Sequence, residues 1–92
     1  DPACGDGNIL CATVEYAKLK YGKTEEVCIF GQDINSKVVF NAAFNVLTLG
    51  IENYRLCAGD SVIGKNLQKC DYVITCPPWG LRGYYDRIDT IP

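Results

Sequence analysis

The sequence has no histidine and no methionine, and it contains no long hydrophobic run. Without histidine, and without a C-x-x-C pair among its six cysteines, the chain lacks the spacing typical of a zinc site or a disulfide framework. No apolar run approaches the roughly 18 to 20 residues that a membrane helix needs, and no secretory signal opens the chain. We therefore expect no metal site and no membrane partner, and we expect reduced cysteines in a cytoplasmic protein.

An excess of positive charge is also missing. Nine lysines and arginines stand against eleven acidic residues, for a net charge of −2. Such a chain has no basic patch large enough to hold a nucleic-acid backbone unaided. The lack of an initiator methionine indicates a segment of a longer protein, and other parts of that protein would then hold any nucleic acid.

Helical and strand-like segments alternate along the chain. Apolar residues at helical spacing predict two helices, over residues 8–21 and about 37–49. Short apolar runs predict three strands, at residues 27–30, 54–58 and 71–75. Strands that alternate with helices are typical of α/β proteins with a mostly parallel sheet and flanking helices. The glycine-rich opening should itself follow a strand, so we expect the segment to begin just after the central strand of its fold.

The unusual residues of this sequence follow the predicted strands. They are the opening "DPACGDG", Asp33, Gly59-Asp60 and "CPPW". Because ligands bind at the carboxyl ends of parallel strands, we expect these residues to share one edge of the sheet. Gly5 and Gly7 either let a backbone approach a ligand at a helix N-terminus or form a tight turn. A dinucleotide site would need a third glycine where Leu10 stands, which argues against NAD or flavin.

Two acids at this edge each have two interpretations. The carboxylate of Asp33 could accept hydrogen bonds from both hydroxyls of a ribose, or it could cap the following helix. Asp60 could accept a hydrogen bond from an adenine amino group, or it could shape a turn after Gly59. Position alone leaves both alternatives open.

The two prolines of "TCPPWG" indicate a stiff loop that is rich in hydrogen-bond acceptors, because Pro77 and Pro78 have no backbone N–H. Carbonyl oxygens that accept both hydrogens of a nucleobase amine localise its lone pair and aim it at an electrophile. Trp79 offers a flat face for a base taken out of its stack. The alternative is a stiff turn whose tryptophan covers the core.

Together these segments resemble the amino-methylating methyltransferases that use S-adenosylmethionine. "DPACGDG" resembles their D-P-A-C-G-S-G cofactor loop, and "TCPPWG" resembles their N-P-P-[FYW] catalytic loop. "FGQDIN" and "VVFNAAFNVLTLGI" most resemble the modification subunit of type I restriction-modification systems, which methylates the exocyclic amine of adenine in DNA. The resemblance implies a Rossmann-like fold, S-adenosylmethionine as cofactor, DNA as substrate, and specificity and restriction subunits as partners. Residues 1–92 would be a partial catalytic domain without its first strand, last strands and target-recognition region.

The resemblance also assigns residues to a site. The cofactor would be bound by Asp1, Ala3, Cys4, Gly5 and Gly7 of the opening loop, by Asp33 at the ribose, by Ile34 and Asp60 at the adenine, and by Ser61. The catalytic residues would be Cys76, Pro77, Pro78 and Trp79, which receive the target base. The opening loop and the proline loop are therefore expected to face each other.

The catalytic loop departs from the family pattern at its first position. The family has Asn, Asp or Ser there, whereas this chain has Cys76, whose sulfur is a weak hydrogen-bond acceptor. This departure motivates one alternative, a non-catalytic homologue that only binds cofactor or acts as a scaffold. A second alternative is an RNA amino-methyltransferase, because Trp79 could stack on a guanine or adenine of RNA equally well.

Overall fold

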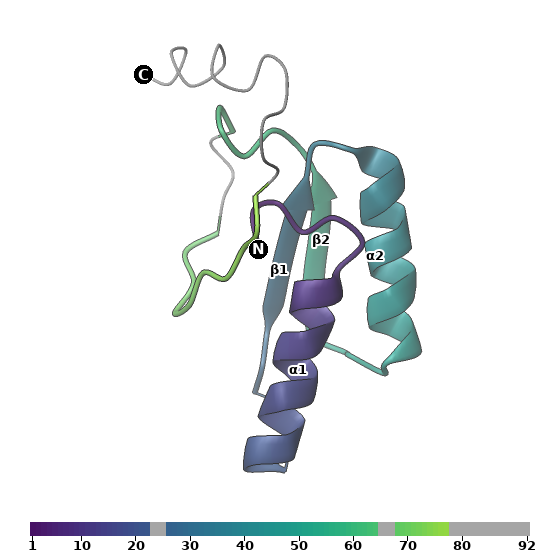
Figure 1. Ribbon diagram of the computed structural model, residues 1–92, viewed down its shortest axis with the longest axis vertical. Coiled ribbons are helices and arrows are strands. Elements are labelled where there is room, and N and C mark those ends of the chain that lie inside the picture. The colour runs from purple at the N-terminus through teal and green to yellow at the C-terminus, as the bar shows by residue number, and fades with distance from the viewer. Residues whose placement is uncertain (23–25, 65–67, 78–92) are drawn as a thin grey trace.

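The computed structural model describes residues 1–22, 26–64 and 68–77, which form a small α/β unit (Figure 1). Its elements are α1 (Asn8–Tyr21), β1 (Ile29–Asp33), α2 (Ser36–Thr48) and β2 (Tyr54–Ala58). The two strands are parallel, with Gly31 of β1 beside Leu56 of β2. Because α2 connects them, β1, α2 and β2 form a crossover unit. The predicted combination of parallel strands and flanking helices is confirmed at this level.

Both helices begin and end close to the predicted residues, because local signals determine their ends. The side-chain oxygen of Asn35 accepts hydrogen bonds from the N–H groups of Lys37 and Val38, and α2 begins directly after it. Gly22 ends α1 with a φ of 75° and donates its N–H to the Lys18 carbonyl. The predicted helix over 8–21 is confirmed, and the second lies one residue earlier than predicted.

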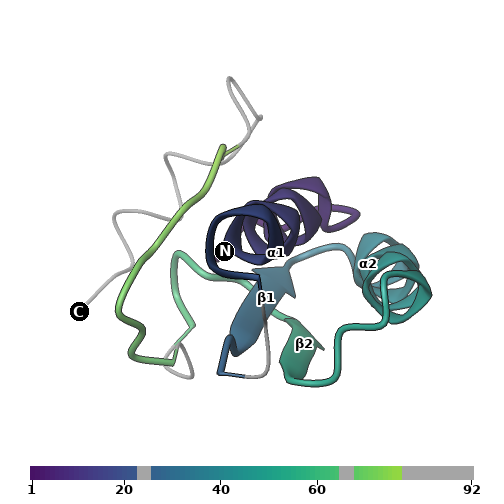
Figure 2. The same cartoon turned by 90° about the horizontal axis from the view of Figure 1, so that it is seen from below.

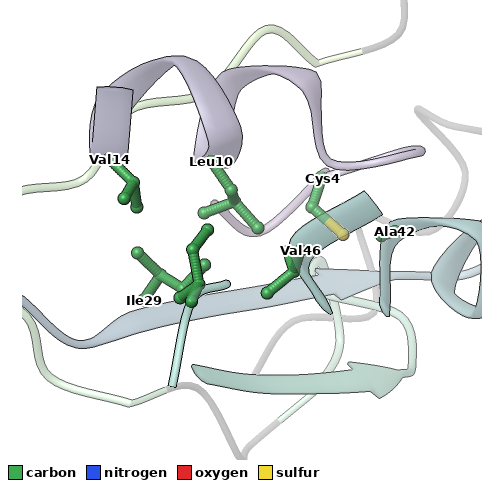
Figure 3. Close-up of a cluster of buried hydrophobic side chains, with 7 residues drawn as sticks. Cys4, Leu10, Val14, Ile29, Ala42 and Val46 are labelled. Atoms are coloured by element: carbon green, nitrogen blue, oxygen red, sulfur yellow. The ribbon is translucent and has the colours of Figure 1, made fainter. Parts of the chain in front are cut away.

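The core lies between the two helices and one face of the sheet, as Figure 2 shows. Its buried side chains, most of which are labelled in Figure 3, are Cys4, Leu10, Val14, Ile29, Ala42, Val46 and Ile51. Gly31 lies under this cluster. A Cβ at this position would come 2.7 Å from Leu10 Cδ1 and 2.7 Å from Leu56 Cδ2, so the glycine lets α1 pack directly on β1.

The first strand extends further than predicted. The apolar run predicts a strand over 27–30 that ends before Asp33, whereas β1 spans Ile29–Asp33. Its pairing with β2 continues to the last residue, because the Asp33 carbonyl accepts a hydrogen bond from Gly59 N–H (2.9 Å). The prediction was wrong here because backbone pairing, rather than apolar side chains, keeps "GQD" in the sheet.

The other edge of β1 pairs with the opening residues. The Asp1 backbone nitrogen donates to the Phe30 carbonyl (2.7 Å), and Gln32 N–H donates to the Asp1 carbonyl (3.0 Å). Cys4 N–H then donates to the Gln32 carbonyl (2.9 Å). This alternation is the pattern of a parallel ladder, so β1 lies between the opening residues and β2.

The predicted strand at 71–75 is wrong. This segment is irregular, and Tyr72, Val73 and Ile74 are 85%, 69% and 50% exposed. A strand needs a neighbouring backbone edge for its hydrogen bonds. Among the described residues, both edges of β1 are already occupied, one by β2 and the other by the opening residues. The apolar run therefore has no edge to pair with beside β1.

Candidate cofactor site at the sheet edge

The glycine loop, residues 1–7, leads from the edge of β1 to the first turn of α1 (Figure 1). Gly5 and Gly7 have φ angles of 53° and 87°, in the left-handed region that favours glycine. A Cβ at Gly7 would also come 3.2 Å from the Ala42 side chain. Gly7 caps α1 without a side-chain hydrogen bond, so the loop brings exposed backbone to the start of the helix, as the sequence predicts.

Asp33 connects the glycine loop to the end of β1. Its Oδ2 accepts a hydrogen bond from Gly5 N–H (2.9 Å), and its Oδ1 accepts one from Asn35 N–H (3.0 Å). Asn35, not Asp33, is the N-cap of α2. The carboxylate therefore lies beside the loop, as expected of a residue in the same site, and it is not the helix cap.

The turn after β2, which we call the second loop (residues 59–61), is held against the glycine loop. Ser61 Oγ donates a hydrogen bond to the Pro2 carbonyl (2.5 Å). Asp60 Oδ1 accepts one from Val62 N–H (3.0 Å), so Asp60 does shape the turn after Gly59. Three segments that are distant in the sequence thus meet at one edge of the sheet.

Gln32 is a residue of this edge that the sequence analysis does not single out. It is only 7% exposed, and its side chain bonds to residues of the second strand and the second loop. Its Nε2 donates to Ser61 Oγ (3.0 Å), and its Oε1 accepts from Cys57 Sγ (3.2 Å). The available signal was a polar amide immediately before Asp33, at the end of an apolar run.

Asp1 carries a carboxylate oxygen that has no hydrogen-bond partner among the described residues. Its Oδ1 accepts a hydrogen bond from Ala3 N–H (3.0 Å), whereas its Oδ2 is buried and unpaired. An unpaired buried oxygen is costly. A ligand that donates a hydrogen bond or carries positive charge would satisfy it.

A cleft of about 610 Å³ lies beside this edge. Predicted cofactor residues Asp1 and Asp60 line it together with Tyr72 and Val73. The segment that leads to the proline loop thus shares a cleft with two predicted cofactor residues.

Cys4 faces the core rather than the cleft (Figure 3). Its Sγ donates a weak hydrogen bond to the Gly5 carbonyl (3.5 Å). Burial raises the pKa of this thiol, and the nearby Asp33 carboxylate raises it further. Contact between Cys4 and a cofactor would therefore involve its backbone.

The remaining predicted site residues lie partly outside the described residues. Ile34 is 56% exposed just after β1, where a flat ligand could pack on it. Cys76 and Pro77 are exposed, whereas Pro78 and Trp79 lie outside the described residues. The expected approach of the glycine loop and Trp79 stays a prediction.

Two further comparisons with the sequence predictions concern membranes and metals. In the part of the chain that the structure describes, no helix has the length and apolar character to cross a bilayer. Within the same residues, no group of three or more cysteine, aspartate or glutamate side chains could hold a metal ion.

The chain belongs to the N-6 DNA methylase family, which it matches over residues 1–91. It is also 35% identical over 92 residues to the type I restriction enzyme MjaVII methylase subunit of Methanocaldococcus jannaschii. That alignment covers 96% of this chain but only 16% of the relative, so the chain spans a small part of that subunit. No solved structure matches the chain.

Proposed function

We propose that the full-length protein containing this chain transfers a methyl group from S-adenosylmethionine to the exocyclic N6 amine of adenine in DNA. The N-6 DNA methylase family supports the reaction, and the type I methylase subunit of M. jannaschii supports a role in restriction-modification. The observation that carries the proposal is the meeting of the glycine loop, Asp33 and the second loop at one sheet edge. DNA and the specificity and restriction subunits are the proposed partners.

The same proposal includes a Rossmann-like methyltransferase sheet. The order of segments across the sheet supports it, since β1 lies between the opening residues and β2. In such a sheet the strand that precedes the glycine loop is central, and the proline loop follows the strand on its other side.

The residues at the edge fit S-adenosylmethionine. When bound, this cofactor supplies an electrophilic methyl group on a sulfonium. The unpaired Oδ2 of Asp1 suits the ammonium of its methionine part. Each carboxylate oxygen of Asp33 accepts one printed hydrogen bond and has a further lone pair, so it can also accept a ribose hydroxyl. Asp60 would accept from the adenine amine, against which Ile34 packs.

The proline loop would orient the target adenine. The carbonyl of Pro77 accepts one amine hydrogen and directs the nitrogen lone pair, while Trp79 stacks on the extruded base. A bond then forms between this nitrogen and the methyl carbon as the carbon–sulfur bond breaks, and the nitrogen loses a proton. The shared cleft of Asp1, Asp60 and Tyr72 supports an approach of this loop to the cofactor residues.

The test uses the full-length protein with its specificity subunit, tritiated S-adenosylmethionine and unmethylated duplex DNA. We expect label in N6-methyladenine of the DNA and none in RNA under the same conditions. Label in RNA alone would favour the RNA alternative, and no label in either polymer would contradict the proposal.

A non-catalytic homologue is the second candidate, and Cys76 is the observation that favours it. The Cys76→Asn variant belongs in the same assay, because the asparagine oxygen restores a good hydrogen-bond acceptor. We expect the natural protein to be active and the variant to be faster, by up to about 10²-fold if one aligned acceptor is missing. Cofactor binding with no transfer, restored by this variant, would support the second candidate.

A further inference from the structure

We propose that Gln32 is a positioning residue of the cofactor site, whose buried amide sets the distance between the glycine loop and the second loop. This inference rests on the proposed function, since the cofactor it concerns is S-adenosylmethionine. Gln32 itself need not touch that cofactor. It acts through the two loops, which carry Asp1 and Asp60.

The backbone and the side chain of Gln32 hold different segments. Its backbone N–H and carbonyl bond to Asp1 and Cys4 of the glycine loop, at 3.0 and 2.9 Å. Its side-chain Nε2 donates to Ser61 Oγ in the second loop at 3.0 Å. Ser61 Oγ in turn donates to the Pro2 carbonyl. One buried residue therefore joins both loops, and the hydroxyl between them completes the connection.

The orientation of the amide is determined by its partners. Cys57 Sγ donates to Oε1 at 3.2 Å, so Nε2 is the end that points to Ser61. Each group in this series, from Cys57 to Gln32 to Ser61 to Pro2, donates to the next. A fully paired buried network of this kind favours one arrangement, because an unpaired member is costly.

Packing restricts the second loop in addition to the hydrogen bonds. A Cβ at Gly59 would come 3.3 Å from the Gln32 side-chain Cδ and 3.3 Å from its Nε2. The loop thus lies directly on the amide, one residue before Asp60. A change in the amide would move Asp60 relative to Asp1, and the two ends of an elongated ligand would no longer fit together.

Since the network bonds to no described residue of the proline loop, we expect Gln32 to affect cofactor affinity rather than the chemical step. The Gln32→Met variant has a similar length and removes both hydrogen-bonding groups. In the full-length protein we expect it to raise the Kd for S-adenosylmethionine about tenfold. At saturating cofactor, kcat and the KM for DNA should change by less than about threefold.

Ser61→Ala breaks the same connection from its other end. We expect a rise in Kd in the same direction, and the double variant should bind no more than about twofold more weakly than the weaker-binding single variant, because coupled residues are not additive. Gln68→Met is the matched control, since it makes the same exchange at an exposed position. Its Kd should equal that of the natural protein.

Several results would overturn the inference. A Gln32→Met protein that melts earlier but, where folded, binds the cofactor with an unchanged Kd would show a purely structural role. Fully additive losses in the double variant would show that Gln32 does not act through Ser61. If Gln32→Met does not fold, an unchanged Kd for Ser61→Ala decides against the inference. No cofactor binding by the natural protein would instead refute the proposed function, and this inference with it.

Discussion

At the scale of single residues, a few polar groups and glycines determine the shape of the candidate site. The sequence predicts the importance of Gly5, Gly7 and Asp33, because glycine-rich turns and acids after strands have local signatures. It does not predict the bond between Gly5 N–H and Asp33 Oδ2, since these residues are separated by 28 positions. Gln32 was missed for the same reason, because its partners Cys57 and Ser61 come from β2 and the second loop.

Cys4 provides a test at this scale. Burial and the Asp33 charge raise the pKa of its thiol, so the protonated form persists near neutral pH. Because the folded state holds this proton more tightly than the unfolded state, the thiol stabilises the fold below the ordinary cysteine pKa. This contribution is lost as the pH rises through the raised value.

We therefore expect slow alkylation of Cys4 in the full-length protein. At about pH 8, iodoacetamide should label exposed Cys28 at least about tenfold faster than Cys4, because the thiolate is the reactive form. Mass spectrometry of the digested protein gives both rates. Equal rates for the two thiols would contradict the burial of Cys4.

At the scale of elements, helices were predicted more accurately than strands. Caps and apolar spacing are local, so the ends of α1 and α2 fall within one residue of the prediction. Strand limits depend on the partner edge. Pairing extends β1 through Asp33, whereas the equally apolar segment 71–75 finds no partner among the described residues and stays irregular.

The N-cap of α2 provides a test of this difference. Asn35→Ala removes an oxygen that accepts two hydrogen bonds, and we expect it to lower the free energy of unfolding by about 0.5–2 kcal/mol. Denaturant titration of the full-length protein measures this change. Asn41→Ala, at an exposed position within the same helix, should change stability by less than about 0.5 kcal/mol. Equal effects of the two variants would contradict the assignment of the cap.

At the scale of the whole molecule, both helices cover one face of the sheet, and the candidate site lies at the carboxyl ends of the strands (Figure 2). Only the folded chain brings together the glycine loop, Asp33 and the second loop. The sequence predicts this meeting because parallel strands place their carboxyl ends at one edge. The meeting with the proline loop stays a prediction, since Pro78 and Trp79 lie outside the described residues.

The most direct test of this account is a calorimetric titration of the full-length protein with S-adenosylmethionine. We expect one cofactor to bind per chain, and the Asp33→Ala variant to bind at least about tenfold more weakly, because it loses the carboxylate that joins the loop and the proposed ribose position. Glu15→Ala, which removes an exposed acid of α1, should bind like the natural protein. Equal affinity of the Asp33→Ala variant and the natural protein, or no binding by either, would contradict a cofactor site at this edge.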